Sequence, residues 1–236
     1  MSDTQTLEPA PPPAPSPGRL LHVIVDPSRG GTGMSPVPLP AGLEIVDIYD
    51  LFAHDLDTVA GINLATQCDQ VFLSRHRDRL DAFVARGGRI LVNGHVVEPF
   101  VTGLAKWRKL AYSQPADLAV TQLAAHPVWQ GVDPRDLLFR TGVPGQHTHA
   151  ELARIGVAGF YGRGYHVRLP EGATPINGLG ELGAVVDYEF ALGAGRVLVH
   201  GGLDLLAMRD PRRTTAAFGE NIVRWLSGGM TPENAQ

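Results

Sequence analysis

The sequence has little of what several protein classes require. Its 236 residues include one cysteine, Cys68, which excludes an internal disulfide framework and a zinc site built from several thiolates. No apolar run approaches the roughly 20 residues that a membrane-spanning helix needs. There are 20 basic and 24 acidic residues and no basic run, which argues against a nucleic-acid surface. We therefore expect a cytoplasmic protein with neither a nucleic-acid nor a membrane partner.

The two ends of the chain differ from its middle. Residues 1–18 are acidic and rich in proline, where a secretory signal peptide would be basic and then apolar. Such a segment has little to bury, so residues 1–18 and 228–236 are predicted to be disordered tails. A hydrophobic content of 44% is enough for residues 19–227 to form a single α/β domain.

The stretch 69–100 organises the rest of the chain. Asp69 is a plausible N-cap for a helix whose apolar stripe continues to Val84, and Gly87-Gly88 supplies a left-handed stop. The apolar run 89–92 is typical of a buried parallel strand, and it runs into the sharp turn Asn93-Gly94-His95. We call residues 93–95 the elbow. In open α/β sheets ligands bind where central strands end, so the elbow predicts a pocket.

Hydrophobic patterns predict the remaining elements. They indicate strands at 20–25, 43–49, 59–62, 184–190 and 195–200, with a hairpin turn at 191–194 and an amphipathic helix at 213–226. A short helix or turn is expected at 96–104, and residues 107–112 and 118–123 form either an added pair of strands or a strand and a connection. A mostly irregular glycine-rich insertion, at about 141–183, is expected to pack on the elbow's side of the sheet. Three tryptophans, Trp107, Trp129 and Trp225, are expected in the core.

A glycine-rich segment after the first strand invites comparison with phosphate-binding loops. Glycines occur at 30, 31 and 33, but neither GxGxxG nor GxxxxGK[ST] is present. Three prolines between residues 36 and 40 prevent the helix that such a loop would need. We expect a long irregular loop over the end of the sheet instead.

Three segments resemble a known superfamily. DRLDAFVARGGRILVNGH resembles the helix, strand and nucleophile turn of class I glutamine amidotransferase-like proteins, and GAGRVLVHGGLDLL resembles their closing strand. HPVWQGVDPRDLLF is similar to a segment of the trehalose-utilisation (ThuA-like) branch. The resemblance spans roughly residues 20 to 227. It implies a flavodoxin-like three-layer α/β/α sandwich with a mostly parallel sheet.

The sequence departs from the superfamily where its chemistry resides. Class I amidotransferases carry a cysteine at the elbow, whereas this elbow reads Asn93-Gly94-His95. His200 matches the superfamily's histidine, but Gly202 stands where a glutamate would follow. Cys68 lies one strand too early. The resemblance therefore implies a protein without ordinary glutaminase activity, which could be a pseudoenzyme.

Several polar residues are expected to meet at one edge of the sheet. His95 and His200 are candidates for acid–base catalysis with a carboxylate or for binding a metal. Alternatively, they form hydrogen bonds with backbone groups at buried strand ends. The candidate ligand-binding residues at this edge are Asp26, Asn93, Gly94, Glu98 and Asp204, and Tyr161 and Arg163 suit stacking and anion binding in the insertion. His147, His149 and Glu151 have metal-ligand spacing, but nearby glycines and a proline favour a solvated loop.

Three functional hypotheses remain open. The first is a non-glutaminase domain that binds a small polar ligand, with a carbohydrate as the ligand that the ThuA-like resemblance suggests. The second is a hydrolase or isomerase that uses His95 and His200 with a carboxylate or metal. The third is an accessory subunit tethered by the proline-rich tail. The sequence identifies no cofactor and assigns no metal, and it leaves a homodimer open.

Overall fold

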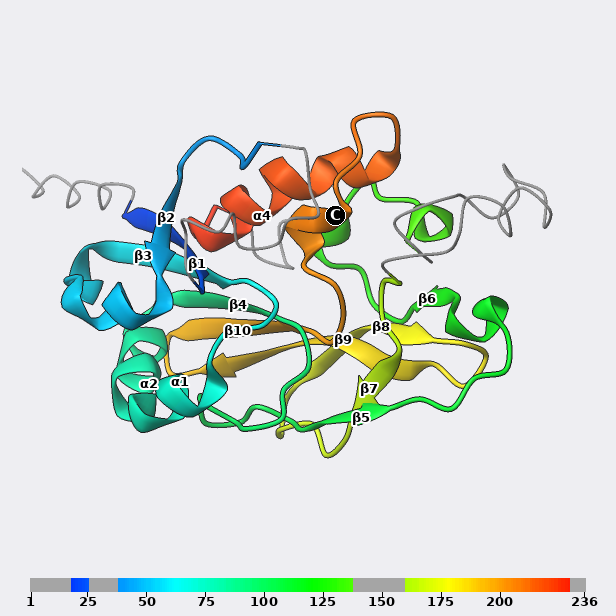
Figure 1. Cartoon of the computed structure of the whole chain (residues 1–236), viewed down its shortest axis with the longest axis horizontal. Coiled ribbons are helices and arrows are strands. Elements are labelled where there is room, and N and C mark those ends of the chain that lie inside the picture. The colour runs from blue at the N-terminus through cyan, green and yellow to red at the C-terminus, as the bar shows by residue number, and fades with distance from the viewer. Residues whose placement is uncertain (1–17, 26–37, 138–159, 230–236) are drawn as a thin grey trace, which may run out of the picture.

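The computed structural model describes residues 18–25, 38–137 and 160–229 and contains one large sheet. Its eight strands run in the order β2-β1-β3-β4-β10-β9-β8-β6 (Figure 1). The strands are β1 (Arg19–Ile24), β2 (Leu43–Asp47), β3 (Val59–Leu64), β4 (Arg89–Asn93), β6 (Val120–Gln122), β8 (Thr174–Leu179), β9 (Ala184–Leu192) and β10 (Gly195–His200). A separate two-stranded ribbon pairs β5 (Trp107–Lys109) with β7 (Gly164–His166).

Five adjacent strands are parallel, and their order defines the fold. β1 pairs with β2 and β3, β3 pairs with β4, and β4 pairs with β10. Counting only these strands, the order is 2-1-3-4-5, which is the flavodoxin-like arrangement. β3, β4 and β10 are buried along nearly their whole length, as their unbroken apolar runs require of central parallel strands. The predicted fold class is confirmed.

Three antiparallel strands extend this sheet. The predicted hairpin is present: β9 and β10 pair with Leu192 opposite Gly195, so only two residues form the turn. β8 pairs with β9, and β6 pairs with β8 at the edge. β8 comes from the glycine-rich insertion, whose described part, residues 160–183, is thus more regular than its composition predicts.

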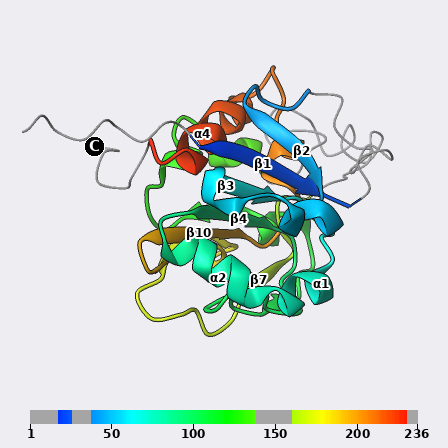
Figure 2. The same cartoon turned by 90° about the vertical axis from the view of Figure 1, so that its left-hand side faces the viewer.

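Helices cover both faces of the sheet. Figure 2 shows α4 (Phe218–Leu226) on one face and α1 (Gln70–Arg75) and α2 (Arg77–Ala85) on the other, which gives three layers. Trp225, Ile222 and Phe218 of α4 are fully buried. Short 3-10 helices lie at Ile48–Ala53, Leu56–Thr58, Pro115–Leu118, Pro127–Trp129, Pro134–Asp136, Leu205–Met208 and Thr214–Ala217. No helix in the described ranges is long and apolar enough to cross a membrane.

Some local predictions are wrong. The single helix predicted after Asp69 is two helices, because His76 leaves helical geometry at φ −113°, ψ 21° and its ring stacks on Phe52. Asp69 does cap the first of them, accepting a hydrogen bond from the Phe72 amide at 2.9 Å. Of the two alternatives predicted for residues 96–104, a short helix or a turn, the structure has bends and a turn. β5 and β6 pair with β7 and β8, so they are not the pair of strands that the sequence suggested.

Candidate functional site

The elbow and the end of β10 lie side by side. In the parallel pairing of β4 with β10, His200 is opposite Asn93, and the Gly94 amide donates to the His200 carbonyl at 2.9 Å. Gly94 has φ +95°, a left-handed conformation that glycine adopts without strain. A Cβ at this position would lie 3.1 Å from the Thr66 methyl carbon. The elbow is therefore a tight turn whose apex carries no side chain.

His200 belongs to a buried hydrogen-bond network rather than to an open cleft. Its side chain and that of Asp187 are both 0% exposed, and Nδ1 lies 2.6 Å from Asp187 Oδ1. The other oxygen of Asp187 accepts from the Tyr161 hydroxyl and from Asn177 Nδ2. Trp129 Nε1 donates to the Tyr161 hydroxyl at 2.8 Å. Burial, followed by the Asp187 charge, raises the pKa of Tyr161 well above its ordinary value, so the hydroxyl stays protonated.

The network fixes the tautomer of His200. A carboxylate only accepts hydrogen bonds, so Nδ1 is the protonated nitrogen and Nε2 carries the lone pair. Within the described part of the chain, buried Nε2 has no hydrogen-bond partner. An imidazole held in this way by a carboxylate is the arrangement used for general-base catalysis.

At residue 202, where the resemblance would place a glutamate, backbone occupies the space for a side chain. A Cβ on Gly202 would lie 1.6 Å from the Tyr161 carbonyl oxygen and 2.9 Å from His200 Nε2. Gly162 and Gly202 form an antiparallel bridge, and the Leu203 amide donates to the same carbonyl at 3.1 Å. No side chain fits at residue 202. The carboxylate that orients His200 comes from β9 instead.

His95 lies outside this network. Its ring is exposed on one side and stacks on Trp107, with ring centroids 3.7 Å apart and planes 16° from parallel. Partial burial lowers its pKa, and the positive charge of Arg163 reinforces the shift, so His95 is neutral at pH 7. Trp107 therefore contacts the candidate site, contrary to its expected place in the core.

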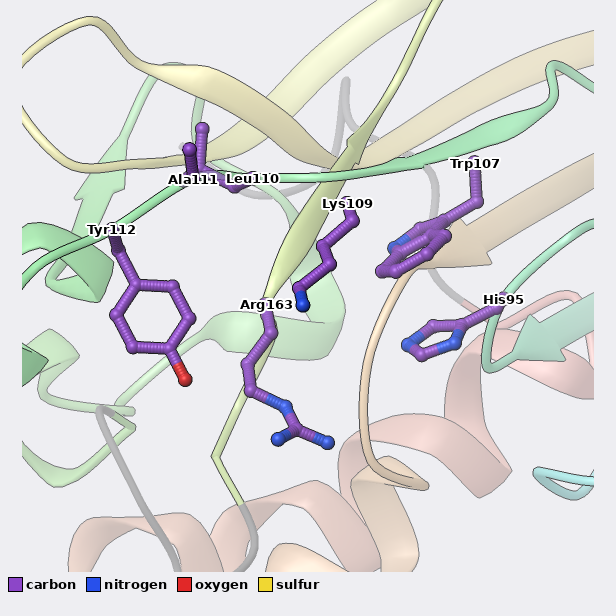
Figure 3. A pocket seen from close by; sticks show the side chains of 7 residues that line it. All are labelled: His95, Trp107, Lys109, Leu110, Ala111, Tyr112 and Arg163. Atoms are coloured by element: carbon purple, nitrogen blue, oxygen red, sulfur yellow. The ribbon is translucent and has the colours of Figure 1, made fainter.

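A pocket of about 820 Å³ opens beside His95. It is lined by His95, Trp107, Lys109, Leu110, Ala111, Tyr112 and Arg163 (Figure 3). The Trp107 amide donates to the Val96 carbonyl at 2.8 Å, which joins the elbow's exit to the β5–β7 ribbon. The pocket thus lies between the elbow and the ribbon. Its volume falls within the range of about 300–1,000 Å³ usual for small-molecule sites.

A second buried polar group stabilises the ends of the parallel strands. Asn93 Nδ2 donates to Asn63 Oδ1 and to the Leu64 carbonyl, both at 2.9 Å, and its Oδ1 accepts from the Leu205 amide at 3.1 Å. Asn63 Nδ2 lies 2.6 Å from Nδ1 of His22, whose pKa is lowered by burial. These bonds use both N–H groups of the Asn93 amide and one lone pair of its oxygen, and they tie three strand ends together.

The other candidate residues occupy different surroundings. Asp204 is 2% exposed and caps a 3-10 helix by accepting from the Leu206 amide at 2.9 Å. Glu98 is exposed beyond the elbow and does not line the pocket. Burial raises the pKa of the Cys68 thiol to about 12, so it is not a thiolate at neutral pH. Asp26, His147, His149 and Glu151 lie outside the described residues. Among described residues, no group of three or more His, Cys, Asp or Glu side chains is arranged to hold a metal ion.

Sequence reasoning missed Asp187 and the pocket residues of the ribbon. Asp187 and Glu189 are charged residues with alternate spacing in an apolar strand, a signal that they share a buried face. A two-residue turn places Asp187 opposite His200, whereas the four-residue turn that we predicted shifts the register. Lys109 and Tyr112 carry no comparable signal, because their role depends on a long-range pairing of β5 with β7.

No protein-family model and no curated protein matches the sequence. Among solved structures, the cytoplasmic protein STM3548 from Salmonella typhimurium is 11% identical, with a TM-score of 0.48 over 88% of this chain and 98% of that one. The cytoplasmic protein STM1381 from Salmonella typhimurium LT2 is 12% identical, with a TM-score of 0.45 over 78% and 81%. A β-galactosidase from Rahnella sp. R3 is 13% identical, with a TM-score of 0.44 over 88% of this chain and 31% of that enzyme. These similarities concern the path of the chain alone.

Proposed function

We propose that this protein is a cytoplasmic, non-glutaminase member of the class I amidotransferase-like superfamily that binds a small polar ligand at the carboxyl edge of its sheet. The observation that carries the proposal is the pocket beside an elbow that has no thiol. The apex of the elbow is Gly94, and Cys68 is a buried thiol with a raised pKa. Non-covalent binding needs neither a nucleophile nor a metal.

The lining of the pocket suits a carbohydrate-sized ligand. Tyr112 and Trp107 offer aromatic surface, the Tyr112 hydroxyl adds a polar atom, and Lys109 and Arg163 offer several N–H donors. Sugars combine apolar ring faces with hydroxyl groups, so they bind well to such a mixture of surfaces. The resemblance to the ThuA-like branch supports the same class of ligand.

A ligand screen tests the proposal. We expect sugars or sugar acids, but not glutamine, to raise the melting temperature of the full chain and to give saturable heats in calorimetry. Tyr112→Ala should weaken binding, whereas Leu123→Ala, an exposed change outside the pocket, should not. If no compound of this class binds, or if both variants bind equally well, the proposed site is wrong.

The His200–Asp187 pair favours a second candidate, a hydrolase that uses water. This scheme requires water and substrate to reach a side chain that is 0% exposed in the structure, so it depends on a local opening at the end of β10. Nε2 would then take a proton from water while the water oxygen attacks an ester or glycosidic carbon, and the imidazolium would return the proton to the leaving oxygen. Nitrophenyl esters and glycosides are suitable probes. His200→Gln should abolish any hydrolysis, while His166→Gln, another buried histidine, should retain it. Equal rates in both variants would exclude His200 as the base.

A further inference from the structure

The two cationic residues of the pocket lie at one end of the β5–β7 ribbon: Lys109 is the last residue of β5, and Arg163 immediately precedes β7. Lys109 is opposite Gly164, and the Leu110 amide donates to the Arg163 carbonyl at 3.0 Å. Gly164 has no room for a side chain, because a Cβ there would lie 2.3 Å from the indole of Trp107 and from the Arg108 carbonyl. Figure 3 shows the side chains of Lys109 and Arg163 extending into the same space, between Tyr112 and His95.

This space carries positive charge that no described residue of the lining neutralises. The described lining residues include no aspartate or glutamate, and neither Lys109 nor Arg163 makes an ion pair with a described carboxylate. Elsewhere in the described chain, pairing is common: seven arginines, Arg19, Arg86, Arg135, Arg196, Arg212, Arg213 and Arg224, contact a carboxylate. Phe160 lies under the Arg163 guanidinium, 5.9 Å from ring centroid to carbon, which limits where that group can turn.

We propose that the ligand is an anion: a sugar-sized molecule whose phosphate or carboxylate group lies between the Lys109 ammonium and the Arg163 guanidinium. This inference rests on the proposed function and specifies its ligand class. The planar guanidinium can donate two parallel hydrogen bonds to such a group, and the ammonium adds a third donor. The remaining polar body of the ligand then lies against Tyr112 and the His95–Trp107 stack.

Calorimetry on the full chain can distinguish this inference from the proposed function. Four probes are compared: glucose 6-phosphate, gluconate, glucose and inorganic phosphate. We expect at least one of the two charged sugars to bind at least about tenfold more tightly than glucose, and its affinity to fall as salt is added. Arg163→Gln and Lys109→Met should each weaken that binding by at least about tenfold.

Arg108→Gln is the matched control. Arg108 is an exposed cation on the same strand, it does not line the pocket, and its loss changes the net charge equally. We expect it to bind the charged sugars like the unmodified chain. Equal weakening by Arg108→Gln would show diffuse attraction and overturn the inference. Glucose binding as tightly as the charged sugars, unaffected by Arg163→Gln, would refute the anion while leaving the pocket intact. Binding of none of the probes would count against both proposals.

Discussion

Replacing Asp187 with alanine tests how much the buried network contributes to the free energy of unfolding. Its carboxylate accepts hydrogen bonds from three buried donors, His200 Nδ1, the Tyr161 hydroxyl and Asn177 Nδ2. Each buried donor left without a partner costs about 1–3 kcal/mol, and His200 can recover part of this by changing tautomer. Three such donors, less the part that His200 recovers, bring the expected cost to about 3–5 kcal/mol. We expect Asp187→Ala to lose that amount of unfolding free energy, a large share of the roughly 5–15 kcal/mol that a domain has.

Urea unfolding followed by tryptophan fluorescence measures this loss, because Trp129 and Trp225 are buried near the network or in the core. Asp187→Asn keeps the volume and one accepting oxygen, so it should cost less than alanine. The control is Glu220→Ala, which removes an exposed ion pair with Arg224 on α4 and should cost about 0.3–0.5 kcal/mol. An Asp187→Ala protein within about 1 kcal/mol of the unmodified chain would refute the reasoning about buried donors.

Three further changes follow from the same structure. Burial lowers the pKa of His166 to about 4. Between pH 6.5 and pH 4 the ring is therefore neutral in the folded state but protonated in the unfolded state. Stability should fall by up to roughly 3 kcal/mol as the pH drops from 6.5 to 4. His166→Asn should remove this slope in urea titrations, and an unchanged slope would assign it elsewhere. Gly202→Ala places a Cβ 1.6 Å from a backbone oxygen and should lower the melting temperature sharply. Gly229→Ala, whose Cβ would have its nearest neighbour at 3.4 Å, should leave the melting temperature unchanged. Similar melting temperatures for the two variants would contradict the close approach at residue 202. Asn93→Leu leaves the Leu205 amide without its acceptor and should cost about 1–3 kcal/mol in the same urea assay, and a neutral result would show that the strand ends do not depend on it.

The parallel half of the sheet could be predicted because local pattern and burial agree there. Strands such as β4 and β10 are short apolar runs bounded by glycine, and a parallel sheet buries such strands on both faces. The chain also places the elbow beside His200, as the order of strands requires. These features need only the period of the hydrophobic residues and the topology of open α/β sheets.

The antiparallel half and the site could not be predicted to the same depth. The register of β9 against β10 depends on whether the turn has two or four residues, and composition alone does not decide this. The partners of β5 and β6 lie more than 50 residues away along the chain, beyond any local pattern. The pocket is built from the β5–β7 ribbon, so the sequence predicted only one of its two cations, Arg163, and missed Lys109.

The absence of a side chain at residue 202 and the position of Arg163 are physically coupled. A side chain at residue 202 cannot coexist with the Tyr161 carbonyl, and that carbonyl is in place because Gly162 and Gly202 form a bridge. The bridge fixes the chain immediately before Arg163 against the end of β10, next to the elbow. The backbone segment that occupies the side-chain space at residue 202 therefore also positions the cation that we assign to ligand binding. The carboxylate that orients His200 does not depend on residue 202, because Asp187 supplies it from the neighbouring strand β9.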